Sequence, residues 1–143
     1  MPTDRIRAVF PHPFLLEYHV TLSVHELTTR LVVHNTSANE TITHQALLHT
    51  YFACDASTVT VSSLKGKTYL DKTKNYAEGV EEREEVDVKE YTDRIYKDAG
   101  DSFTIKDAEG GIHIRTHGFN DTVVWNPHAE AGRAIGDMEE GGW

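Results

Sequence analysis

The chain is poor in cysteine and in long hydrophobic runs. Cys54 is its only cysteine, so no disulfide can form within the chain, and a secreted fold held together by disulfides is excluded. We therefore expect a reducing compartment, the cytoplasm. The segment Phe10–Phe14 is interrupted by prolines and a histidine and cannot serve as the hydrophobic region of a signal peptide. No apolar stretch reaches the length of a membrane span, and we expect no membrane partner.

Positive charge is also scarce. There are 14 lysines and arginines against 23 aspartates and glutamates, a formal net charge of −9. This charge would repel the phosphate backbone of nucleic acids and the surface of anionic membranes, so we expect neither as a partner. An anionic small substrate would need a local basic pocket. The acidic excess is concentrated in Glu78–Glu85, a run that is typical of a solvated loop or sheet edge.

The signatures of several catalytic classes are missing. The nine histidines include no His-x-His pair, and His113 and His117 would lie about 13 Å apart along an extended strand. We therefore assign no metal site, although three histidines could still meet across different strands. No Gly-rich segment opens a helix after a strand, as a phosphate-binding loop requires. Neither Cys54 nor Ser62 lies in a pattern typical of a catalytic nucleophile.

The hydrophobic pattern is that of β-strands. Apolar and polar residues alternate over Phe14–Leu22 and again over Leu27–Val33, which predicts a β-hairpin with one apolar, inward face. A dense turn signal follows, and Thr41–Phe52 is predicted to form a long third strand. Shorter strands are predicted at Thr58–Val61, Thr68–Leu70, Glu85–Val88, Arg94–Tyr96, Ser102–Ile105, Ile112–Arg115 and Thr122–Trp125.

Turn signals and one helix complete the pattern. Lys65–Lys67 and Glu109–Gly111 indicate hairpin turns. One helix is predicted over Pro127–Ile135, with Asn126 as its cap and Gly136 as its stop. Short strands separated by turns indicate an all-β fold, an antiparallel sandwich or barrel. The length of 143 residues suits one domain with one core.

His49 is the candidate for chemistry. It follows Ala46, Leu47 and Leu48 near the end of the predicted third strand. A histidine can hold and deliver a proton near neutral pH, so it could serve as a general acid or base. A buried histidine is more often a hydrogen-bonded structural residue. The residues alone leave both interpretations open.

Five short segments, spread along nearly the whole chain, are informative when taken together. They are Phe10–Phe14, Leu48–Phe52, Leu64–Lys72, Tyr91–Tyr96 and Asp121–Pro127. In this order they resemble the glucose-6-phosphate 1-epimerases, or hexose-6-phosphate mutarotases, of the aldose 1-epimerase superfamily. The resemblance implies a galactose-mutarotase-like β-supersandwich of antiparallel strands with one short helix near the C-terminus. It also implies that residues 1–143 form a single, partial mutarotase-like domain.

The resemblance gives two residues a role. It implies that His49 is the catalytic acid and that Asp93 is the carboxylate that binds the substrate, a hexose 6-phosphate such as glucose 6-phosphate. From the residues alone, Asp93 is as readily a surface partner of Arg94 or a turn residue. The implied reaction opens the sugar ring by acid and base catalysis and closes it to the other anomer, and it needs no metal and no organic cofactor.

The chain also departs from the family pattern. The resemblance places the family's catalytic glutamate beyond Trp143 and the arginines that contact the phosphate before Met1. We therefore expect a chain that is truncated at both ends, with low or no activity on its own. His128 stands where the family usually has tryptophan. The alternative is a non-catalytic carbohydrate-binding or interaction module that keeps part of the fold.

Overall fold

The structure is a computed structural model that describes residues 3–136. The chain divides into two compact units, Met1–Thr50 and Tyr51–Trp143, called unit 1 and unit 2 below. Strands dominate both units, and every strand pairing is antiparallel. The all-β class predicted from the sequence is therefore confirmed. Within the described part of the chain, no helix is long and apolar enough to cross a membrane.

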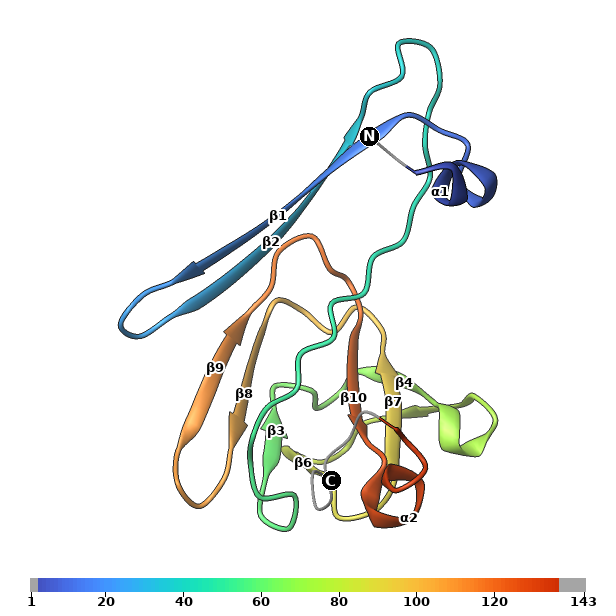
Figure 1. Cartoon of the computed structure of the whole chain (residues 1–143). Helices are drawn as coiled ribbons and strands as arrows, with labels where there is room; N and C mark the ends of the chain where they lie inside the picture. The colour runs from blue at the N-terminus through green and yellow to red at the C-terminus, as the bar shows by residue number, and fades with distance from the viewer. Residues whose placement is uncertain (1–2, 137–143) are drawn as a thin grey trace. The chain divides into compact units, whose positions relative to one another are not determined.

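Unit 1 contains the predicted hairpin. Strand β1 (Phe14–Leu22) pairs with β2 (Leu27–Asn35) over nine rungs, as the ribbon in Figure 1 shows. A short helix that the sequence did not predict, α1 (Asp4–Val9), precedes the hairpin, and the Thr3 hydroxyl accepts a hydrogen bond from its first turn. The alternation of β1 is as predicted, but its apolar face is not buried. Its members Leu16, Tyr18, Val20 and Leu22 are 52 to 79% exposed.

The predicted third strand is wrong. Residues 41–52 have no regular secondary structure, and Leu47 is exposed. An extended segment forms a strand only when a neighbour supplies ladder hydrogen bonds, and no described strand pairs with this one. The apolar residues of this segment match the pattern of a strand, but no described strand lies beside the segment to pair with it.

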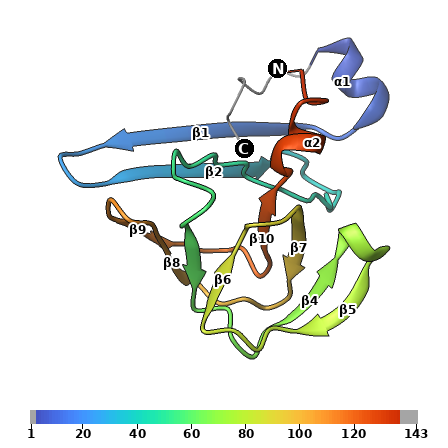
Figure 2. The same ribbon diagram turned by 90° about the horizontal axis from the view of Figure 1, so that it is seen from below.

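Unit 2 consists of two four-stranded sheets, each visible in Figure 2. The first sheet has the order β10 (Thr122–Asn126), β7 (Thr92–Tyr96), β4 (Thr68–Asp71) and β5 (Ala77–Val80). The second sheet has the order β6 (Glu85–Asp87), β3 (Thr60–Ser62), β8 (Ser102–Lys106) and β9 (Gly111–Arg115). All seven short strands predicted from the sequence are present, and β5 is an addition.

Both sheets contribute to one core. Its buried members are Val59, Leu64, Val86, Val88, Tyr96, Ala99, Phe103 and Val124. Because directly paired residues of an antiparallel sheet lie on the same face, the register of Val124 with Arg94 and of Tyr96 with Tyr69 defines the inner face of the first sheet. The residues that alternate with these along each strand point to the opposite, outer face.

The turns and the C-terminal helix differ in detail from the prediction. Glu109–Gly111 makes the predicted hairpin between β8 and β9. Lys65–Lys67 is a turn, with Gly66 at a φ of 78°, but it connects the second sheet to the first and does not close a hairpin. Helix α2 covers His128–Gly132 only. Pro127 precedes it, and the Asn126 side chain accepts a hydrogen bond from the His128 amide.

Candidate active site

Asp93 lies in the middle of the first sheet, on its outer face. It belongs to β7 and pairs directly with Trp125 of β10. Its neighbour Arg94 pairs with Asp71 and faces the core side, because successive residues of a strand point to opposite faces. Asp93 is therefore not a turn residue or a surface partner of Arg94, and these two simpler interpretations are wrong.

The Asp93 carboxylate is buried and only half-satisfied. Its side chain is 8% exposed. Oδ2 accepts a hydrogen bond from Lys72 Nζ at 2.6 Å, whereas Oδ1 is buried with no hydrogen-bond partner. Buried polar atoms are nearly always hydrogen-bonded, because an unmade bond costs about 1–3 kcal/mol. Asp93 Oδ1 therefore lacks the hydrogen-bond donor that a buried carboxylate oxygen normally has.

Lys72 is held in place by the turn that it opens. It is the first residue of η1 (Lys72–Lys74), a 3₁₀ turn that follows β4. Asp71 caps this turn, since its Oδ1 accepts hydrogen bonds from the Thr73 amide at 3.0 Å and the Thr73 hydroxyl at 2.6 Å. The hydrogen bond to Asp93 raises the pKa of Lys72, despite a smaller opposing effect of desolvation. The ammonium group therefore stays charged at neutral pH.

Aromatic residues lie on the strand and the segments beside this ion pair. Trp125, opposite Asp93, is half-buried and makes an edge-on contact with Tyr51 at 6.0 Å between ring centroids. Tyr76 and Tyr91 both contribute to the raised pKa of Lys72. Each of these tyrosines is about half exposed. Aromatic rings beside a few polar groups are typical of sites that bind small organic ligands.

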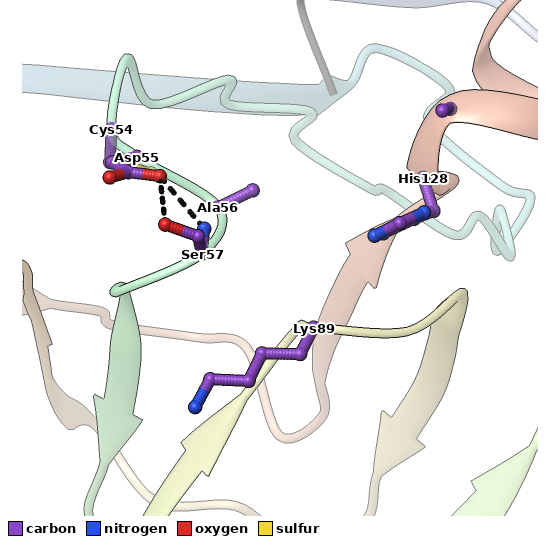
Figure 3. A pocket seen from close by; sticks show the side chains of 7 residues that line it. Cys54, Asp55, Ala56, Ser57, Lys89 and His128 are labelled. Carbon is purple, nitrogen blue, oxygen red and sulfur yellow. Dashed lines mark hydrogen bonds between the residues drawn. The ribbon is translucent and has the colours of Figure 1, made fainter.

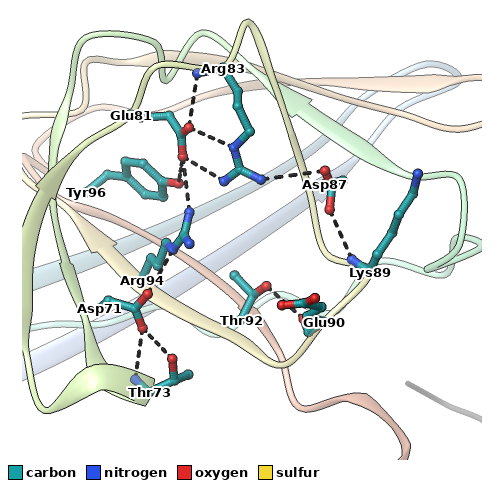
Figure 4. A network of polar contacts seen from close by, with 10 residues as sticks. All are labelled: Asp71, Thr73, Glu81, Arg83, Asp87, Lys89, Glu90, Thr92, Arg94 and Tyr96. Carbon is teal, nitrogen blue, oxygen red and sulfur yellow. Dashed lines mark hydrogen bonds and ion pairs between the residues drawn. The ribbon is translucent and has the colours of Figure 1, made fainter.

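A second polar cluster lies on the inner face and has a different character. Figure 4 shows Glu81 at its centre. Glu81 accepts hydrogen bonds from Arg83 Nε at 2.8 Å, from the Tyr96 hydroxyl at 2.8 Å and from Arg94 Nη1 at 3.3 Å. Arg94 also donates to Asp71 and stacks over the Tyr69 ring at 4.5 Å. Both carboxylates of the cluster, Asp71 and Glu81, accept hydrogen bonds. The cluster therefore stabilises the fold and offers no free carboxylate to a ligand.

The pKa shifts in this cluster follow from its pairing. Burial alone would raise the pKa of Glu81, but hydrogen bonds from Arg83 and Tyr96 outweigh it and lower the pKa to about 2. Burial, with the hydrogen bond to Glu81, raises the pKa of Tyr96 to about 12. Glu81 belongs to the acidic run predicted as a solvated loop or edge. That prediction holds for Glu78 on the edge strand β5 and is wrong for Glu81, whose residue is 3% exposed.

His49 lies in unit 1, whereas Asp93 lies in unit 2. It is exposed and belongs to the segment without regular secondary structure. It makes no hydrogen bond or ion pair with any residue that the structure describes. The interpretation of His49 as a hydrogen-bonded core residue is therefore wrong, and its role as the catalytic acid stays a prediction.

An open cavity of unit 2 lies elsewhere. It has a volume of about 490 Å³ and is lined by the loop Cys54–Ser57, by Lys89, and by His128 and Ala129 at the start of α2. Figure 3 shows that the polar side chains of this loop bond to one another, since Asp55 accepts hydrogen bonds from Ser57. Burial raises the pKa of the Cys54 thiol, which disfavours the thiolate that a nucleophile needs. No group of three His, Cys, Asp or Glu residues in the described segment 3–136 is arranged to hold a metal ion.

The structure adds residues that the sequence did not single out. Lys72 follows Asp71 at the end of a strand, and nothing in a lone lysine indicates that it meets a carboxylate 21 residues away. Trp125 was predicted as a strand residue, but its position opposite Asp93 depends on the register between β7 and β10. The signal that could have found them is the alternation of β7, which separates Asp93 from Arg94.

Comparison with known proteins points to sugar chemistry. A family model described as aldose 1-epimerase matches residues 2–143. The chain is also similar to a protein of Cenchrus ciliaris named "Putative glucose-6-phosphate 1-epimerase", with 28% identity over 143 residues that include 96% of this chain. The chain spans 43% of the length of that relative.

Proposed function

Because the chain belongs to the aldose 1-epimerase family, we propose that it binds a hexose 6-phosphate, with glucose 6-phosphate as the first candidate, and serves the interconversion of its α and β anomers. The observation that carries this proposal is the buried Asp93 carboxylate, whose Oδ1 has no partner. The relative's name supports the choice of a hexose 6-phosphate. We also propose that residues 1–143 form one partial mutarotase-like domain and act in the cytoplasm, as the single cysteine suggests.

The outer face of the first sheet suits a sugar. A hexose presents several hydroxyl donors, and we propose that one of them supplies the donor that Asp93 Oδ1 lacks, while Lys72 keeps its bond to Oδ2. The Trp125 ring on the neighbouring strand offers apolar surface to the carbon-bound hydrogens of the sugar. Polar groups that fix orientation beside an apolar wall are the usual composition of a small-molecule site.

His49 is the proposed general acid. The imidazolium donates its proton to the ring oxygen of the sugar while the bond between that oxygen and the anomeric carbon breaks. The anomeric hydroxyl loses its proton to a base, which gives the open-chain aldehyde. Rotation about the adjacent carbon–carbon bond and closure with the proton transfers reversed yield the other anomer. We assign no residue of this chain as the base.

Exchange spectroscopy tests the proposal. The rate at which the α and β anomers of glucose 6-phosphate interconvert is measured by NMR with the 143-residue chain, with His49→Asn and with the matched control His44→Asn, which changes another exposed histidine of the same segment. Acceleration that is lost in His49→Asn and retained in His44→Asn supports the assignment. Acceleration that survives in His49→Asn rejects His49 as the acid. No acceleration by the unchanged chain, the result expected of a chain without its base, rejects catalysis by residues 1–143 alone.

The non-catalytic binding module is the second candidate, because no described residue holds the His49 side chain in place and a general acid needs a fixed position. Calorimetric titration with glucose 6-phosphate distinguishes the two functions. Binding without any acceleration of anomer exchange assigns a binding module. Binding with acceleration assigns the epimerase.

A further inference from the structure

The ion pair of Lys72 and Asp93 is asymmetric. The lysine side chain is 38% exposed, whereas the aspartate side chain is 8% exposed. Lys72 Nζ bonds only one of the two carboxylate oxygens, at 2.6 Å. The ammonium group therefore fixes one oxygen and leaves the other, buried oxygen without a partner.

This pair differs from the Glu81 cluster in how many oxygens are bonded. Lys72 donates to one oxygen of Asp93, whereas both oxygens of Glu81 accept hydrogen bonds. Arg94, which follows Asp93 in the sequence, forms ion pairs with Asp71 and Glu81 on the inner face. Lys72 is thus the one cation that the described residues provide to Asp93.

A carboxylate that binds a ligand through one oxygen must be held against rotation. Asp93 has a torsion that would exchange its two oxygens, and the bond from Lys72 to Oδ2 fixes it. Lys72 itself is fixed by η1, which Asp71 caps with two hydrogen bonds to Thr73. Asp71 therefore stabilises η1, η1 holds Lys72, and Lys72 holds Asp93.

We propose that Lys72 is a positioning residue of the sugar site, which holds Asp93 so that its Oδ1 accepts a hydrogen bond from a sugar hydroxyl. This inference rests on the proposed function, because it assumes that the sugar binds at Asp93. It adds a residue that acts through Asp93 and does not itself contact the phosphate. It gives a role to the buried carboxylate oxygen that has no partner among the described residues.

The test is a double-mutant cycle in ligand binding. Affinity for glucose 6-phosphate is measured by calorimetry for the 143-residue chain and for Lys72→Met, Asp93→Asn and the double variant. The matched control is Lys74→Met, which removes an exposed lysine from the same 3₁₀ turn. Lys72→Met should weaken binding about tenfold to a hundredfold, as expected for loss of a charge-assisted hydrogen bond. Lys74→Met should change it less than about twofold.

The cycle shows whether Lys72 acts through Asp93. If it does, adding Lys72→Met to Asp93→Asn weakens binding no further, because the group that Lys72 positions is already lost. Additive effects would overturn the proposal, since they would mean that Lys72 contacts the sugar or its phosphate directly. Lys72→Arg, which keeps a cation, should recover most of the affinity, and no recovery would count against the positioning role.

Failure of this inference differs from failure of the proposed function. A chain that binds no glucose 6-phosphate overturns the proposed function and the role of Lys72 with it. Binding that Lys72→Met leaves unchanged overturns the role of Lys72 alone. The ion pair is also checked without sugar, because Asp93→Asn should lower the pKa of Lys72 measured by NMR, and an unchanged pKa would show that the pair does not form.

Discussion

Replacing Glu81 by glutamine should destabilise unit 2 by about 3 kcal/mol at pH 7. The side chain is 4% exposed and bonds Arg83, Arg94 and Tyr96. Its pKa falls from 4.5 to about 2 on folding, and each unit of pKa corresponds to about 1.4 kcal/mol of stability. The loss of one partner from a buried ion pair costs a similar amount, about 3–5 kcal/mol.

The sign of the pH dependence follows from the lowered pKa of Glu81. A carboxyl group whose pKa is lower in the folded state contributes its full stability above pH 4.5 and loses it as the pH falls towards 2. The difference in the free energy of unfolding between the unchanged chain and Glu81→Gln should therefore shrink to about 1 kcal/mol at pH 3. Acidic groups that share no partner with Glu81 cancel in the difference.

Urea unfolding followed by circular dichroism at pH 7, 5, 4 and 3 measures this difference. Glu82→Gln is the matched control, because Glu82 is the exposed neighbour in the same acidic run. It should change the free energy of unfolding by less than about 0.5 kcal/mol. Equal effects of the two substitutions at pH 7, or a difference that does not depend on pH, would refute the assignment of Glu81 as the centre of the cluster.

Three further substitutions test the packing of unit 2, each by urea unfolding. Gly79→Ala should cost about 1–3 kcal/mol, because its Cβ would lie 2.7 Å from the Tyr69 ring; an unchanged stability would show that the ring moves freely. Tyr96→Phe should cost about 1–2 kcal/mol, since Glu81 loses a buried hydrogen bond, and a stabilised variant would contradict this. Leu64→Ala should cost about 2–5 kcal/mol, because Leu64 is fully buried; a cost below 1 kcal/mol would place it outside the core.

The strands of unit 2 were predictable because their pattern and their neighbours agree. Each predicted strand from Thr58 onwards has a partner in one of the two sheets. The segment Thr41–Phe52 has an equally apolar pattern but no partner within the described residues, so the pattern alone was misleading. Strand formation depends on long-range pairing, which a local alternation of residues does not encode.

The site was predictable only in part for the same reason. The family resemblance implies that Asp93 binds the substrate, which stays a prediction, whereas its burial and its unsatisfied oxygen follow from the sheet that encloses it. Glu81 and Glu82 are adjacent glutamates in one acidic run, yet one is buried among arginines and the other is exposed. Their burial differs because of the path that the chain takes between β5 and β6, and the composition of the run does not predict that path.

The most direct test of the account is to map where glucose 6-phosphate binds. Amide and side-chain NMR shifts of the isotope-labelled chain are followed during titration with the sugar phosphate. The account predicts that the largest changes occur at Asp93, at Lys72 and at the Trp125 indole, on the outer face of the first sheet. Changes centred instead on the cavity between Cys54 and His128, or no changes at all, would contradict it.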